Sequence, residues 1–278
     1  MGLQAESAGV SAMNDKIMLF VKFGEEKYVR RLFNGRMYFS NAVKFRGIEK
    51  ENGVKGQGDA FEAILQLKSV HTIVIDPRTG LSISHPDTTV SLRLADTENI
   101  PVFCITCISE GDCIVQEKNG KQIITVSDAL RDTITAHFPK ADTAGVFFQP
   151  QRFIDSLAGL GVTCHDRVRY FDFSPKGVVK EMIEYIAQQP GTISKHNHSL
   201  FSMSIEMNDG ERNRLEITAR NMKHILFCKD HYFAGENEYR IILPQKRIYA
   251  PKEYAIRWGK QKKKMCPIDE FFDGIELL

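Results

Sequence analysis

Apolar residues fall into short runs separated by turn signals at the start of the chain. Residues 17–23 form one such run and predict a buried strand. Residues 25–33 carry apolar side chains at helical spacing behind two glutamates that suit the positive end of a helix, and an Asn-Gly pair suits its end. Residues 37–40 predict a second strand, and we expect the polar, glycine-rich stretch 46–59 to be a loop.

The next part of the chain tends to alternate apolar and polar residues with a period of two. This pattern predicts half-buried strands at 63–75, 81–85 and 88–94. We expect turns between them at Asp76-Pro77 and His85-Pro86.

Residues 101–108 are largely apolar and predict a central strand, and residues 113–126 predict a hairpin because Asn-Gly stands at their middle. Helices with one apolar face are predicted at 127–138, 150–160, 175–189 and 209–228, and further strands at 201–207, 238–243 and 254–258. Strands and helices alternate irregularly, and no strand–helix unit carries a glycine fingerprint. We therefore predict the α+β class.

Composition describes an ordinary globular chain of 278 residues, with 42% hydrophobic and 26% charged residues. We expect residues 1–16, which are polar and rich in small residues, to be a disordered leader, and residues 17–278 to form a single domain. No apolar run approaches the roughly 18 residues that span a bilayer, so no membrane partner is expected. Without an export signal, the six cysteines predict a cytoplasmic protein with reduced thiols.

The most informative short stretch is Glu-Asn-Glu-Tyr-Arg at 236–240. On a strand, Glu236 and Glu238 would point to the same side, and two neighbouring carboxylates would raise the pKa of one of them. Such a pair costs stability and is therefore a candidate functional site. The alternative is an exposed strand edge with two solvated glutamates.

Two other patterns are weaker. Cys104 and Cys107 have metal-ligand spacing, but on a strand their thiols would face opposite sides, so we expect core cysteines and no metal. The basic run that holds Lys262, Lys263 and Lys264 is typical of a solvated face, and contact with a nucleic-acid backbone is the weaker hypothesis because the formal net charge is only +2.

Fragments between residues 17 and 243 together resemble a large bacterial family of unknown function. Residues 20–23 resemble its Lys-aromatic strand, 34–40 its Asn-Gly motif ending in Tyr-Phe-Ser, and 59–62 its Asp-x-Phe-Glu segment. Residues 236–240 resemble its most recognisable motif. That family is similar to ADP-ribosyltransferases, in which helices flank split mixed or antiparallel sheets and NAD binds in the cleft.

The resemblance implies the roles of individual residues. Lys22 would hold the phosphates or the adenine ribose of NAD, Tyr38 would stack on the nicotinamide, and Ser40 would support the strand, with Phe39 beside them in the cofactor-binding set. Glu238 would stabilise the sugar cation. Glu236 would orient or deprotonate the nucleophile on a macromolecular target, either protein or nucleic acid.

Three hypotheses remain open at this point. The first is an NAD-consuming transferase or glycohydrolase of a toxin or phage-defence system. The second is a non-catalytic module of the same fold that binds a nucleotide or a partner protein. The third is a nucleic-acid-binding protein that uses the lysine run.

Overall fold

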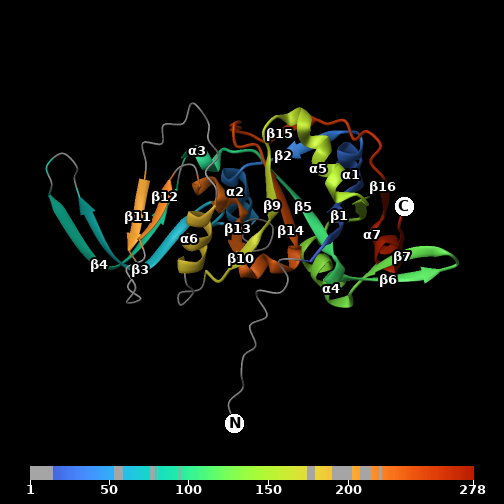
Figure 1. Ribbon diagram of the computed structural model, residues 1–278, viewed down its shortest axis with the longest axis horizontal. Helices are drawn as coiled ribbons and strands as arrows, with labels where there is room; N and C mark the ends of the chain where they lie inside the picture. Colours follow the sequence, from blue (N-terminus) through green and yellow to red (C-terminus); the bar gives the residue numbers. More distant parts are fainter. Residues whose placement is uncertain are drawn as a thin grey trace, which may run out of the picture.

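The computed structural model describes residues 15–52, 59–75, 79, 81–93, 95–173, 179–189, 202–206, 214–218 and 221–278. Within these residues, mainly antiparallel sheets pack with helices, which confirms the predicted α+β class (Figure 1). Most of the predicted leader and the turn at 76–77 lie outside the described residues.

Six strands form the central sheet in the order β16-β8-β1-β5-β14-β9, and every neighbouring pair is antiparallel. Their bounds are β1 Ile17–Gly24, β5 Val102–Ser109, β8 Thr143–Phe147, β9 Cys164–Arg167, β14 Glu238–Ile242 and β16 Lys263–Pro267. The strands predicted at 17–23, 101–108 and 238–243 are confirmed and lie next to one another as β1, β5 and β14.

The sheet divides between β1 and β5. Pairing of these two strands ends at Val21 opposite Thr106, although β1 continues its pairing with β8 as far as Gly24 opposite Thr143. On the other side, β5 stays paired with β14 down to Val102 opposite Ile242. The end of β1 therefore leaves with β8, the start of β5 leaves with β14, and a gap opens between them.

Alternation along the strands gives the sheet two different faces. Phe20, Ile105 and Tyr239 belong to one apolar cluster on the first face, which also holds Phe153 of α5 (Pro150–Asp155) and Trp258. The opposite face carries two separate clusters. One lies around β1 and β8 and the other around the start of β5 and the end of β14. Thr106 and Glu238 lie on this second face, between the two clusters.

Helix α1 (Glu26–Phe33) and strand β2 (Arg36–Phe39) confirm the two elements predicted after β1. Gly35 links them with a φ of +77°, and a Cβ at this position would overlap the carbonyl oxygen of Ile256. Only glycine meets both conditions without strain. Strand β2 pairs with β15 (Lys252–Ala255) outside the central sheet.

The predicted Asn-Gly hairpin is confirmed as β6 (Cys113–Lys118) and β7 (Lys121–Val126). Asn119 and Gly120 both have positive φ, at 55° and 74°, as a two-residue hairpin turn of this kind requires. Further elements are α3 Ala95–Glu98, η2 Glu110–Asp112, α4 Asp128–His137, η3 Ser156–Leu160, β10 Arg169–Phe171, α6 Val179–Gln188, β13 Cys228–Asp230, η5 His231–Glu236, α7 Ile268–Asp273 and β17 Ile275–Glu276.

Two of the predicted elements were wrong. Residues 46–52 of the expected loop at 46–59 belong to helix α2 (Ala42–Asn52), whose first turn is fixed by a hydrogen bond from Lys44 N to Asn41 Oδ1 of 2.9 Å. Within the described residues of the expected helix at 209–228, the chain forms strand β12 (Arg214–Thr218) and the 3-10 helix η4 (Met222–Phe227). Strand β12 pairs with β11 (Ser202–Glu206), and this pairing decides its conformation.

The predicted turn at His85-Pro86 was also wrong, because β4 (Ser82–Leu92) runs through it. Its partner β3 (Leu65–Ile75) shifts register between Val70, which lies opposite Thr88, and Thr72, which lies opposite His85. Such an irregularity lets a proline, which has no N–H to donate, stay within a strand. No helix in the described part of the chain is long and apolar enough to cross a membrane.

Candidate functional site

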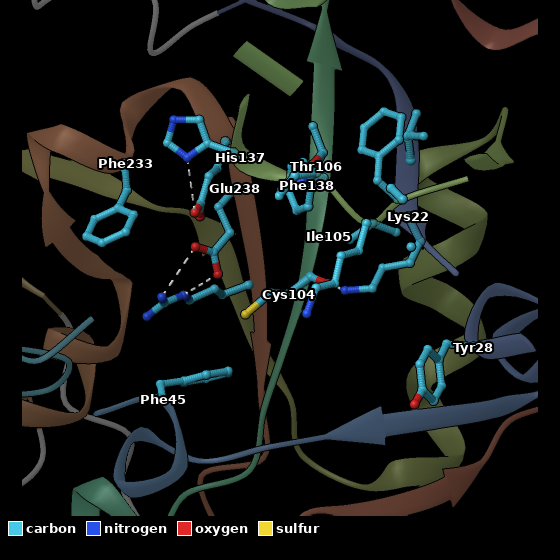
Figure 2. A pocket seen from close by; sticks show the side chains of 18 of the residues that line it. Lys22, Tyr28, Phe45, Cys104, Ile105, Thr106, His137, Phe138, Phe233 and Glu238 are labelled. Atoms are coloured by element: carbon cyan, nitrogen blue, oxygen red, sulfur yellow. Dashed lines mark hydrogen bonds and ion pairs between the residues drawn. The ribbon is translucent and has the colours of Figure 1, made fainter. Parts of the chain in front are cut away.

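A cavity of about 370 Å³ lies where the sheet divides (Figure 2). Residues of β1 and of β5 line two of its sides, and the residues around the start of β14 line a third. Aromatic side chains complete the wall. The lining includes Val21, Lys22, Tyr28, Phe45, Asp59, Glu62, Cys104, Ile105, Thr106, His137, Phe138, Lys229, Phe233, Glu236, Glu238 and Arg240.

Glu238 begins strand β14 and lies in the cavity wall, where it is 5% exposed. Its Oε1 accepts a hydrogen bond of 2.7 Å from Arg240 Nε, and its Oε2 accepts one of 3.0 Å from Lys229 Nζ. Burial opposes ionisation of this carboxyl, but the charges of Arg240 and Lys229 outweigh burial, and the pKa of Glu238 is lowered. Glu238 is therefore a carboxylate at neutral pH.

Glu236 lies beside Glu238 for a reason other than strand alternation. It is the last residue of η5, and the left-handed Asn237 (φ 44°) turns the chain into β14. Lys229 Nζ joins the two glutamates, since it also donates to Glu236 Oε2 at 2.6 Å. The predicted neighbourhood of the two carboxylates is thus observed, but the expected raised pKa is not found at Glu238, because a shared cation lies between the two groups.

Arg240 is the fully buried centre of this charge cluster. Its guanidinium forms two bonds to the Glu62 carboxylate, of 2.5 and 3.0 Å, in addition to its bond to Glu238. A bidentate arginine–carboxylate pair fixes both partners in one orientation. Arg240 therefore holds Glu238 in place and ties the 59–62 segment to the central sheet.

Asp59 is a second buried carboxyl in the cavity wall. It is 3% exposed, and burial together with the neighbouring charge of Glu62 raises its pKa to about 7. Glu238 and Asp59 thus have opposite shifts, because two cations bond directly to Glu238 whereas burial dominates at Asp59.

Lys22 extends from β1 into the gap between the strands, as Figure 2 shows. Its Nζ donates a hydrogen bond of 2.8 Å to the carbonyl oxygen of Cys104 and lies 5.3 Å from the centre of the Phe103 ring. The amine thus occupies the position at which the β1–β5 ladder has ended. The structure places Lys22 on the same cavity as Glu236 and Glu238.

The other three predicted cofactor-binding residues are elsewhere. Tyr38 is 54% exposed on β2, Phe39 is fully buried beside Phe103 and Tyr254, and Ser40 forms a backbone bridge to Val102. None of them is among the described residues that line the cavity. The expected stacking by Tyr38 is therefore not supported by its position, because β2 pairs with β15 and not with the divided sheet.

Sequence reasoning missed the aromatic wall and four titratable members of the site, His137, Lys229, Asp59 and Glu62. His137 ends α4 and places its Nδ1 3.6 Å from Glu236 Oε1. Lys229 belongs to β13 and carried no sequence signal of its own. Asp59 and Glu62 stand in the Asp-Ala-Phe-Glu segment that was noted for its resemblance, so this segment was the available clue.

The cysteine and lysine patterns have clear positions. Cys104 and Cys107 contribute to different apolar clusters on opposite faces of β5, which confirms the prediction from alternation. No group of three possible metal ligands occurs among the described residues. In the basic run, Lys263 Nζ donates to the carbonyl oxygen of Phe33 and Lys264 pairs with Glu270 at 2.6 Å, whereas Lys262 is exposed. Nucleic-acid contact by this run stays a prediction.

Comparison with known proteins adds no relatives: no protein-family model matches the chain, and no curated protein or solved structure matches it. The geometry of the cavity is therefore the basis on which a function is assigned.

Proposed function

We propose that the cavity binds NAD and that the protein cleaves the bond between nicotinamide and ribose, transferring ADP-ribose to a macromolecular target or to water. One observation carries the proposal. Two neighbouring carboxylates, Glu236 and Glu238, line a cavity in a divided sheet, and a lysine, Lys22, stands in the gap between the strands. An ADP-ribosyltransferase-like arrangement of the sheets is part of the same proposal.

The charge of the cluster suits a reaction that forms a cation. Three carboxylates (Glu62, Glu236 and Glu238) face two cations (Lys229 and Arg240), so this cluster of five side chains has a formal charge of −1. The sugar develops positive charge as its bond to nicotinamide breaks. A fixed negative charge accelerates the step when it stabilises this transition state more than it stabilises the bound substrate.

The proposed step is balanced as follows. The bond from ribose C1′ to the nicotinamide nitrogen breaks, and its electron pair neutralises the positive nicotinamide ring. A nucleophile of the target, or water, forms the new bond to C1′, and its proton passes to Glu236 as general base. Glu238 faces the ribose. Lys22 supplies positive charge toward the NAD diphosphate, and the aromatic wall provides contacts for the rings.

The test is nicotinamide release from NAD by the wild type and by Glu238→Gln. We expect the substitution to reduce release by about 10²- to 10³-fold, the usual range for loss of one preorganised electrostatic group. Glu117→Gln, on the exposed strand β6, should release nicotinamide at the wild-type rate. Full activity in Glu238→Gln would exclude the assigned role.

Because Glu238 is buried, the substitution can disturb folding, so thermal unfolding of the variant must be measured alongside. Glu236→Gln provides a second test, since the Glu236 side chain is 13% exposed and belongs to the cavity rim. We expect it to slow turnover while the protein keeps its fold.

One observation favours a second candidate, a module that binds the nucleotide without turnover. Both oxygens of Glu238 are already engaged by Arg240 and Lys229. In that case the wild type would bind NAD in calorimetry and release no nicotinamide. Absence of both binding and release would reject both candidates.

A further inference from the structure

The segment 59–62 is held rigidly at the cavity wall. Phe61 N donates to Asp59 Oδ1 at 2.9 Å, and Glu62 N donates to the Asp59 carbonyl at 3.0 Å. Arg46 Nη1 donates to the Glu62 carbonyl at 2.7 Å, while Arg240 holds the Glu62 carboxylate. The backbone and one carboxyl oxygen of Asp59 are thereby fixed.

None of these hydrogen bonds involves the second carboxyl oxygen of Asp59. In the described structure, Oδ2 is buried and has no hydrogen-bond partner. A buried polar atom without a partner costs free energy, and native proteins leave few of them. Asp59 lines the cavity, so a ligand in the cavity is the natural source of the missing partner.

The neighbours of Asp59 indicate which part of a ligand would reach it. Glu62 and Arg240 connect Asp59 to Glu238: Glu62 N donates to the Asp59 carbonyl, and Arg240 bonds to the carboxylates of both Glu62 and Glu238. Asp59 and Glu238 thus line the same cavity with one residue pair between them. If Glu238 faces the ribose, the ring attached to that ribose lies toward Asp59. The Phe45 side chain lines the same cavity and can make an apolar contact with the nicotinamide ring.

We propose that Asp59 is a specificity-determining residue that accepts a hydrogen bond from the carboxamide N–H of the nicotinamide ring, an inference that rests on the proposed function. The same acceptor repels a ligand that carries a carboxylate in place of the carboxamide. The site thus distinguishes an amide from an acid at this one position. Discrimination against a ligand that leaves a buried polar group unpaired is characteristically strong.

The experiment compares the binding of NAD and nicotinic acid adenine dinucleotide, in which a carboxylate replaces the carboxamide, by calorimetry at pH 8. We expect the wild type to prefer NAD by about tenfold or more. Asp59→Asn has the same shape and offers an N–H to the carboxylate, so its preference should disappear through a gain in affinity for the acid. A gain in affinity cannot result from misfolding.

Asp269→Asn on the exposed face of α7 is the matched control and should keep the wild-type preference. Unchanged preference in Asp59→Asn, with NAD binding intact in the wild type, would overturn the inference and leave the proposed function standing. A dinucleotide with hypoxanthine in place of adenine tests whether Asp59 contacts the adenine ring instead. If the wild type loses affinity for this dinucleotide and Asp59→Asn loses it equally, the assignment to the carboxamide stands. Dependence of that loss on Asp59 would overturn the assignment. If the wild type binds no dinucleotide, the proposed function and this inference fail together.

Discussion

Asp59 and Glu238 are two buried carboxyl groups in the same cavity whose pKa values are shifted in opposite directions. Glu238 accepts bonds from two cations, and its charge is the stable form. Asp59 has the N–H of Phe61 as its partner, and burial together with the like charge of Glu62 opposes its ionisation, so its pKa is raised to about 7 and it ionises above that pH. A pair of titratable groups whose environments push their pKa values apart is typical of functional sites.

Asp59 should make the protein less stable as the pH rises. Its pKa is raised from 3.8 to about 7, so between these values the folded state binds more protons than the unfolded state. The free energy of unfolding then falls with increasing pH, by at most about 1.4 kcal/mol per pH unit from this group, and levels off above pH 7. Asp59→Asn removes this contribution.

We therefore expect the stability of Asp59→Asn relative to the wild type to increase between pH 5 and pH 8, as measured by urea unfolding. Asp269→Asn should show a constant difference across this range. A difference for Asp59→Asn that stays flat with pH would show that Asp59 is ionised throughout.

At the scale of elements, the contact between α4 and η5 positions the carboxylate pair. Gly235 of η5 packs so closely against Thr133 of α4 that an added Cβ would overlap the Thr133 Cγ2 methyl group. This approach brings His137, at the end of α4, beside Glu236, at the end of η5. Two short helices that meet at a glycine thus place two members of the site.

Gly235→Ala should destabilise the protein by about 1–3 kcal/mol, as overpacking typically does. Thr133→Ser removes the overlapping methyl group and keeps the hydroxyl that donates to the Ala129 carbonyl at 2.8 Å. The double variant should recover most of the loss in urea unfolding. Equal losses in the single and double variants would show that the cost comes from the backbone and not from the contact with Thr133.

The division of the sheet is the second element-scale feature of the site. Pairing with β8 keeps the end of β1 extended after its pairing with β5 has stopped. The amine of Lys22 then bonds to the Cys104 carbonyl in the gap. A cavity therefore forms inside the sheet region without leaving this carbonyl unpaired.

At the scale of the whole molecule, the charge cluster connects parts of the chain that are far apart in sequence. Glu62 and Arg240 are separated by 178 positions and are each 1% exposed. The pair ties the loop after α2 to β14, and Lys229 extends the connection to β13 and η5. Removing one partner of such a pair leaves a buried charge without compensation.

Glu62→Gln should therefore lower the free energy of unfolding by about 3–5 kcal/mol. Urea unfolding measures this loss, and Glu117→Gln, on the exposed part of β6, should be close to the wild type. A loss at Glu62 no larger than that at Glu117 would mean that the buried pair contributes little to stability.

Local sequence determined much of this protein. Apolar runs identified β1, β5 and β14, the Asn-Gly pair identified the β6–β7 hairpin, and alternation placed Cys104 and Cys107 on opposite faces. The proximity of Glu236 and Glu238 was also predicted, although the turn at Asn237 and not strand alternation produces it. These features depend on backbone geometry and neighbouring residues, which a short stretch of sequence contains.

Tertiary structure alone decided the chemistry of the site. The pairing of Arg240 with Glu62, the insertion of Lys229 between two glutamates and the placement of Tyr38 on a separate ribbon all depend on contacts between distant segments. The direction of each pKa shift depends on burial and on the charges within a few ångströms. Both are properties of packing, and neither can be read from the spacing of residues along the chain.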